Sequence, residues 1–529
     1  MKKLGVFMSL MLLFSALYCA SPAVAAEEAG KQVLRFGAVN MRSTLDMQYN
    51  TYPGVMDISD HVAEPLVMFD YKMNLIPVLV KELPKPTEGG KVYRFELKPD
   101  IKFHDGTTLK ASDVKFSFER MFLAENGAMN SYIADMIVGA KDMLAGKSTE
   151  LVGFKIIDDL TFEITLETPY APFLASIGTP YGSIYPEKAC REAGKNWGLT
   201  TYFGTGPYRI TKFDTDNGFY VERFEDYHGK KPKLDAIDFV FIEDLNTRRM
   251  EYERGNLDVI RLEATLYTEY SKSPFAPEIG SFTPQGTIFV SPNLQDEHLG
   301  NVKVREAISY AVNRDILVGD LMNNTVSLAT TFIPPSMMGF DKAVPAYEYN
   351  VEKAKQLMEE AGYKDGFEVD AYIRSEQIND TPGRTLLALQ SQLKAIGISI
   401  NIVQVDAASW SDIRRGGKIP VYVGTWYTDF PDPDGFINSY LYSSNARLFS
   451  NHYNNPEFDK LLDEARSSTD PAKREEMYKK ADHLASRVDF SVIPLFHENM
   501  FYLCKPYVKD LNKSPDNTFH FFDAYIEKK

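Results

Sequence analysis

A chain of 529 residues is too long for a single hydrophobic core, so two or three domains are expected. Hydrophobic residues make up 44% of it and charged residues 25%, which is the composition of an ordinary globular protein. The net charge of −15 argues against a nucleic-acid partner, because such a partner would select a basic surface.

The first 26 residues have the pattern of a secretory signal peptide. Two lysines precede an apolar run over residues 4–17, which is too short to span a membrane, and small residues follow it. Cys19 raises the alternative of a lipid anchor, but Tyr18 stands where a lipoprotein signal has a small residue. We therefore expect cleavage near Ala26 and an exported, soluble, periplasmic protein.

The N-terminal half then alternates strand and helix patterns. Apolar periodicity and turn residues predict these elements: a strand over 33–39, a helix over 55–62, strands over 93–97 and 101–104, a helix opening near Ser112, and a hairpin of 154–157 with 161–166. A tight turn is expected at Asp105-Gly106, between the second of these strands and the helix.

The C-terminal half shows clearer helices, with strands between them. Helical spacing and capping residues predict helices near 304–312, from Asn350 to Gly362, and from Asp470-Pro471 onward. The strands predicted between these helices are 369–373, 398–403 and 421–425. This alternation favours an α/β domain.

Catalytic and metal-binding motifs do not stand out. There is no GxSxG serine motif, and the eight histidines form neither an HxH nor an HExxH pair. The glycines of 204–208 (GTGPY) lack the third glycine of a phosphate loop, so they predict a structural turn. We expect no enzyme activity, no cofactor and no metal site. After the signal peptide only Cys190 and Cys504 remain, and either a disulfide or two free thiols fits the sequence.

The stretch from Leu97 to Arg120 carries the most specific pattern. Its diagnostic residues are Leu97, Lys98, Phe103-His104-Asp105-Gly106, Leu109, Ala111, Asp113-Val114, Phe116-Ser117 and Arg120. This pattern resembles the signature of the family-5 extracellular solute-binding proteins of ABC importers, which take up dipeptides, oligopeptides, nickel chelates and some oligosaccharides. Further similar runs occur at 204–208, 304–314, 354–363 and 493–496, so the resemblance covers the whole chain after the signal peptide.

The resemblance implies an α/β, two-lobed periplasmic-binding-protein fold (type II, cluster C) with an extra small domain. The implied boundaries are 27–64, 178–285 and 490–529 for lobe I, 65–177 for small domain II, and 286–489 for lobe III. It also implies a monomer that captures a peptide between its lobes and delivers it to an ABC transporter permease. A nickel or metal-chelate ligand or an oligosaccharide is the alternative within the family, and a secreted hydrolase is the alternative from another class.

Four residues are candidates for the ligand site. By resemblance, Trp426 and Asp429 correspond to the tryptophan that lines the pocket of peptide-binding members and the aspartate that pairs with the peptide ammonium. A buried ammonium needs such a carboxylate, since an unpaired charge in a closed cleft is costly. Arg374 lies near an arginine that takes the ligand carboxylate in dipeptide-binding relatives, although a surface arginine also fits. Trp410 matches a tryptophan near the cleft, and a helix-packing residue fits it equally.

Overall fold

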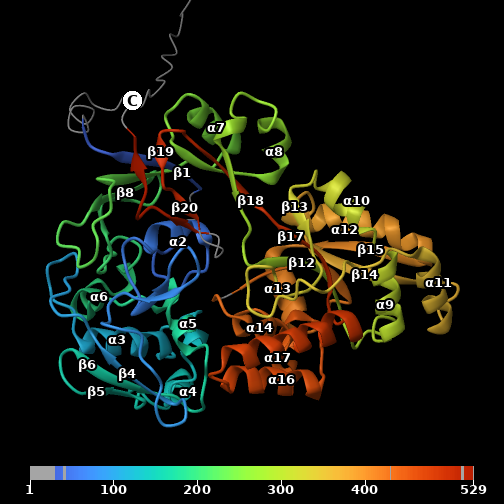
Figure 1. The fold of residues 1–529 in the computed structure, drawn as a ribbon, viewed down its shortest axis with the longest axis horizontal. Helices are drawn as coiled ribbons and strands as arrows, with labels where there is room; N and C mark the ends of the chain where they lie inside the picture. The colour runs from blue at the N-terminus through green and yellow to red at the C-terminus, as the bar shows by residue number, and fades with distance from the viewer. Residues whose placement is uncertain (1–29, 40–42, 429, 514–517, 528–529) are drawn as a thin grey trace, which may run out of the picture.

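Two bodies lie side by side, and the C-terminal segment passes between them (Figure 1). The computed structural model describes residues 30–39, 43–428, 430–513 and 518–527. The predicted signal peptide with Cys19 lies outside the described residues, and so does Asp429.

The first body contains lobe I, which is built on a mixed seven-stranded sheet. Its central strand β1 (Val33–Ala38) runs parallel to both neighbours, β9 (Ala236–Phe241) and β10 (Val259–Leu262). Antiparallel strands extend the sheet on both sides: β18 (Met500–Cys504) and β11 (Ile279–Phe282) beyond β10, and β8 (Gly218–Arg223) and β7 (Tyr208–Asp214) beyond β9. The helices of this lobe are α2 (Pro53–Ser59), α6 (Glu187–Ala193), α7 (Leu245–Glu253) and α8 (Ala264–Tyr270). The strand and helix predicted at its start are confirmed.

The small domain is packed onto lobe I. Its sheet has the order β4 (Val92–Glu96), β6 (Thr161–Thr165), β5 (Phe154–Ile156), and its helices are α3 (Ala111–Phe122), α4 (Ala140–Leu144) and α5 (Phe173–Ile177). The predicted hairpin of β5 and β6 and the predicted helix α3 are confirmed. One continuous hydrophobic cluster joins the small domain to lobe I, so the two form one body.

The strand predicted over 101–104 is wrong. Only Lys102 pairs there, in a single antiparallel bridge to Thr108, because the chain turns back at once. The turn is fixed by the amide of Gly106, which donates to the carbonyl of Phe103, and by the Asp105 side chain, which accepts from the amide of Thr107. A stretch that reverses within six residues is too short to enter a sheet.

The second body, lobe III, contains a six-stranded sheet. Its order is β13 (Val326–Leu328), β17 (Ile493–Glu498), β12 (Gly286–Pro292), β16 (Val421–Tyr427), β14 (Phe367–Arg374), β15 (Ile398–Val405). Because β14 is parallel to both β15 and β16, the carboxyl ends of these three strands meet at one edge. The predicted strands of the C-terminal half are confirmed. Separate hydrophobic clusters lie within this body.

Helices cover the sheet of lobe III, and their caps follow the sequence signals. They are α9 (Val302–Ala311), α10 (Arg314–Ile316), α11 (Val351–Glu360), α12 (Thr381–Leu393), α13 (Ala407–Arg415), α14 (Ile437–Leu441), α15 (Ser443–Ala446), α16 (Pro456–Ser467) and α17 (Pro471–His483). The Asn350 side chain accepts from the amide of Lys353, and Asp470 caps α17 in the same way. Gly362 follows α11 with φ of 87°, the left-handed conformation typical of a helix end.

Short strand pairs complete the described chain. They are β2 (Val67–Phe69) with β3 (Leu75–Pro77), β19 (Val508–Lys509) with β22 (Tyr525–Ile526), and β20 (Asn512–Lys513) with β21 (Phe519–His520). The glycines of 204–208 lie directly against the backbone after α2. A Cβ on Gly204 would come within 2.6 Å of the Ala63 Cα, and one on Gly206 within 2.5 Å of the His61 carbonyl oxygen. This close approach explains the glycines without any phosphate.

The chain crosses between the two bodies at two adjacent places. The first crossing lies between β11 and β12, and the second at Asn499, between β17 and β18. The hydroxyl of Thr283 donates to the Asn499 side-chain oxygen at 2.6 Å, which ties the crossings together. Since β17 pairs within the six-stranded sheet, the second crossing is at Asn499 and not at residue 490, where the resemblance put the boundary. We therefore propose that lobe III extends to Glu498.

Candidate functional site

A cleft of about 770 Å³ lies between the two bodies beside the crossings. On the lobe I side it is lined by the ends of β1 and β10 and the start of α2. On the lobe III side it is lined by residues 322–326 and by residues 379–384 at the start of α12. Its floor is the second crossing, from Glu498 to Phe501. The volume lies in the range of about 300–1,000 Å³ that is usual for ligand pockets.

Three arginines line this cleft, and two of them are already neutralised. Arg261 donates to Asp57 at 2.8 Å, and Arg248 donates to Glu263 at 3.0 Å. Arg384 differs, because its guanidinium donates to the carbonyl of Leu321 at 2.5 Å. Within the described part of the chain, no carboxylate forms an ion pair with Arg384. It therefore presents a positive charge at the cleft that lacks an anionic partner.

The floor of the cleft holds a carboxyl group. The hydroxyl of Tyr427, at the end of β16, donates to Glu498 at 2.5 Å. Burial raises the pKa of Glu498, and the hydrogen bond from Tyr427 opposes that shift. Strand β16 of lobe III is thereby held against the crossing.

A second, smaller cleft of about 70 Å³ is also lined by α2. Lobe I contributes Met56 and Asp60 from α2 and the turn after it, and lobe III contributes Thr428 and Phe430. Gly54 and Asp57 of the same helix line the larger cleft. Helix α2 therefore contributes residues to both clefts.

The predicted site residues fall into two groups. Asp429 lies outside the described residues, while its chain neighbours Thr428 and Phe430 line the smaller cleft. Trp410, Trp426 and Arg374 are described, and none of them is among the residues that line either of these two clefts. Each of these three makes its contacts inside lobe III instead.

Trp426 and Trp410 pack within lobe III. The indole nitrogen of Trp426 donates to the carbonyl of Phe436 at 3.0 Å, and its ring contacts those of Tyr440 and Phe449 with centroids 5.3 and 5.1 Å away. Trp410 on α13 meets the Tyr422 ring edge-on at 5.3 Å. Trp426 therefore anchors the end of β16 from which the loop over 428–436 leaves.

Arg374 makes only local contacts at the end of β14. Its Nε donates to the Gln377 side chain at 2.9 Å and lies 3.5 Å from Glu376. By contrast, Arg261 and Arg384 line the cleft, and sequence reasoning missed both. Arg261 lies in a strand and Arg384 in the first turn of a helix, so neither carried a local signal.

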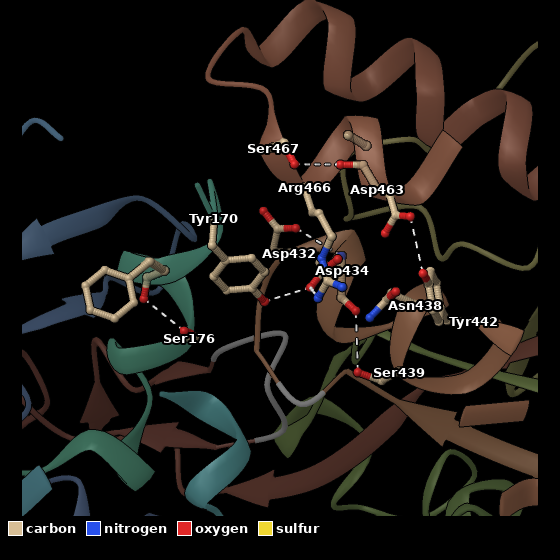
Figure 2. Close-up of polar contacts among 12 residues, drawn as sticks. Tyr170, Ser176, Asp432, Asp434, Asn438, Ser439, Tyr442, Asp463, Arg466 and Ser467 are labelled. Atoms are coloured by element: carbon tan, nitrogen blue, oxygen red, sulfur yellow. Dashed lines mark hydrogen bonds and ion pairs between the residues drawn. The ribbon is translucent and has the colours of Figure 1, made fainter. Parts of the chain in front are cut away.

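The acidic loop after Asp429 is fixed by arginines. Asp432 accepts two hydrogen bonds from Arg474, at 2.7 and 2.9 Å, inside lobe III. Asp434 accepts from Arg466 at 3.1 Å and from the hydroxyl of Tyr170 at 2.6 Å (Figure 2). Burial raises the pKa of Asp434, and the Arg466 charge opposes that shift. Tyr170 belongs to the first body, so this contact joins the two bodies.

Cys190 and Cys504, the two cysteines among the described residues, are free thiols, so no disulfide joins them. Cys190 is buried and Cys504 is partly buried, and desolvation raises the pKa of each to about 12. Such thiols are poor nucleophiles. The described residues hold no group of three or more histidine, cysteine, aspartate or glutamate side chains suited to a metal ion. In the same part of the chain, every helix is too short or too polar to cross a membrane.

Comparison with known proteins identifies the family. Residues 74–447 match the model of the bacterial extracellular solute-binding proteins, family 5, so the chain belongs to this family. It is 28% identical over 458 residues to the dipeptide-binding protein of Escherichia coli (strain K12), with 83% of this chain and 84% of that protein covered. It is 29% identical over 487 residues to heme-binding protein A of Haemophilus influenzae, with 89% and 88% covered.

A solved structure supports the fold. The binding protein DppA from Helicobacter pylori, in complex with the peptide STSA, matches with a TM-score of 0.76 at 23% identity, and the match covers 95% of this chain and 100% of that chain. The resemblance inferred from the stretch between Leu97 and Arg120 is confirmed, and so is the two-lobed α/β fold class.

Proposed function

We propose that this protein captures a peptide between its two bodies and delivers it to the permease of an ABC importer. The observation that carries the proposal is that α2 lines two clefts between the bodies, the larger of which contains Arg384. No carboxylate of the described residues forms an ion pair with Arg384, which therefore supplies a positive charge at the larger cleft. Asp429 follows Thr428, which lines the smaller one. A zwitterionic peptide matches this polarity, with its carboxylate toward Arg384 and its ammonium toward Asp429.

The related proteins support a peptide as the ligand. A relative that covers most of this chain is a dipeptide-binding protein, and a solved structure of the same fold holds the peptide STSA. In this proposal Arg384 replaces Arg374 as the partner of the ligand carboxylate. In this proposal Trp426 anchors the end of β16 through its contacts with Phe436, Tyr440 and Phe449. We expect an affinity near the micromolar level, about −8 kcal/mol.

The remaining features of the proposal extend the expectations from the sequence. The protein would be exported to the periplasm through its N-terminal signal and would act as a monomer without a cofactor. It would bind its ligand without catalysing a reaction. Two adjacent crossings between the bodies provide a hinge, and closure about it would bury the ligand and create the surface that the permease recognises.

Calorimetry can test the ammonium end with the tightest binder from a library of di- to pentapeptides. Truncating one partner of a buried ion pair costs about 2–5 kcal/mol. Asp429→Ala should therefore weaken binding roughly thirty- to several-thousand-fold. N-acetylating the peptide should cause a similar loss in the parent protein and little further loss in the variant. If the two losses simply add, Asp429 does not hold the ammonium.

The carboxylate end has a matched test. Arg384→Met should weaken binding of the free peptide roughly tenfold or more, since a hydrogen bond to a charged group contributes about 1.5–3 kcal/mol. A C-terminally amidated peptide should bind the variant and the parent about equally. Arg374→Met is the control, and it should leave both affinities unchanged. If Arg374→Met loses more peptide affinity than Arg384→Met, Arg374 and not Arg384 binds the ligand carboxylate.

A further inference from the structure

The two bodies also meet at a boundary that does not include the crossings. In the lower middle of Figure 1, the region around α5 faces α14, α16 and α17. The hydroxyl of Tyr170, just before α5, donates to the Asp434 carboxylate at 2.6 Å, and the amide of Ala171 donates to the carbonyl of Arg466 at 2.7 Å. Two neighbouring residues of the first body thus make two hydrogen bonds to lobe III.

This second contact is charged, and two of its side chains are buried. Tyr170 is 6% exposed and Asp434 is 2% exposed. The guanidinium of Arg466 lies over the Tyr170 ring, 5.3 Å from its centroid, and donates to the same carboxylate oxygen that Tyr170 reaches. Figure 2 shows Tyr170 coming from the small-domain side and Arg466 and Asp434 from lobe III. A hydrogen bond to a buried carboxylate is among the strong ones.

The lobe III half of the contact is held together by bonds within lobe III. Arg474 binds both oxygens of Asp432, two residues before Asp434, and Asp432 also accepts from the amide of Asp434 at 3.0 Å. Arg466 pairs with Asp434 from within the same lobe. If the bodies parted, Asp434 would lose Tyr170 but keep Arg466, so its charge would stay paired. The contact can therefore break and re-form without leaving a buried charge unpaired.

We propose that Tyr170 and Ala171 on one side, and Asp434 and Arg466 on the other, form a latch that stabilises the closed conformation. The latch would raise ligand affinity without touching the ligand. A ligand that binds only the closed form binds more tightly when a larger fraction of the protein is already closed. This inference rests on the proposed capture of a ligand by closure. It also gives a role to the second aspartate of the PDPDG sequence at 431–435, which ligand binding leaves unused.

The test is Tyr170→Phe, which removes the hydroxyl and keeps the ring under Arg466. The matched control is Tyr442→Phe, because the Tyr442 hydroxyl also donates to a carboxylate, that of Asp463 at 3.2 Å, but both residues belong to lobe III. Peptide binding to Tyr170→Phe should weaken about tenfold, mainly through faster dissociation. Tyr442→Phe should bind like the parent protein.

A second readout needs no peptide. Small-angle scattering of protein stripped of ligand by unfolding and refolding should give a larger mean radius of gyration for Tyr170→Phe than for the parent and the control. Equal radii for all three proteins, together with unchanged dissociation rates, would overturn the latch. An equal loss of affinity in both variants would overturn it as well. Because the scattering measurement involves no peptide, it still tests the latch if the ligand proves not to be a peptide.

Discussion

The hinge and the latch join the same two bodies through hydrogen bonds of equal length, yet we expect them to act differently. Thr283 and Asn499 are 2.6 Å apart, as are Tyr170 and Asp434. The hinge pair lies on two segments that the chain itself holds side by side. The latch pair comes from separate bodies, and its members are 264 positions apart in the sequence. Opening must break the latch bond and can leave the hinge bond intact. We therefore expect the location of a contact relative to the crossings, more than its hydrogen-bond length, to decide whether it affects ligand affinity.

The largest effect expected from this comparison comes from removing the support of the latch. Asp432→Ala leaves the Arg474 guanidinium buried without its carboxylate, and Arg474 is only 7% exposed. Breaking a buried pair in this way costs about 3–5 kcal/mol of stability. Urea unfolding followed by tryptophan fluorescence would measure it, because Trp410 and Trp426 both lie in lobe III.

An exposed aspartate in the same lobe provides the control. Asp463 accepts from the Tyr442 hydroxyl at the surface of α16, and Asp463→Ala should change the unfolding free energy by less than about 0.5 kcal/mol. Equal losses in Asp432→Ala and Asp463→Ala would mean that the buried pair does not hold the loop in place.

A smaller effect is expected at the hinge. Thr283→Val removes the hydroxyl that donates to Asn499 and keeps the branched shape of the side chain. The free energy of unfolding should fall by about 1 kcal/mol. Peptide affinity should stay within about twofold of the parent, since the bond lost is present in both conformations. A loss of affinity as large as that of Tyr170→Phe would erase the distinction between hinge and latch.

The sequence predicted most of the fold because local signals agree with the tertiary structure there. The Asn350 and Asp470 caps, the Asp158-Asp159 hairpin turn and the alternation of β14, β15 and β16 with helices all follow local patterns. The strand predicted over 101–104 failed because the turn at Asp105 competes with strand pairing. Ile101 and Phe103 are apolar and alternate as in a strand, which explains the wrong prediction. Both are buried although they lie outside any strand.

The candidate site was less predictable, because it is assembled from distant parts of the chain. Arg384 and Arg374 are both arginines of lobe III, and only their surroundings separate the one that lines the cleft from the one paired locally. Likewise, Asp432 and Asp434 lie two residues apart in one motif, but one pairs inside lobe III and the other also reaches Tyr170. No local pattern encodes a partner that lies 264 residues away.

The central claim is that the cleft between the bodies captures a peptide. Identifying the ligand that co-purifies with the protein tests this claim most directly. Protein isolated gently from its native host can be examined by native mass spectrometry and then denatured to release the ligand. We predict peptides that carry both a free amino and a free carboxyl terminus, with one bound per protein chain. A metal chelate or an oligosaccharide in their place, or no peptide bound even after incubation with the peptide library, would contradict the account.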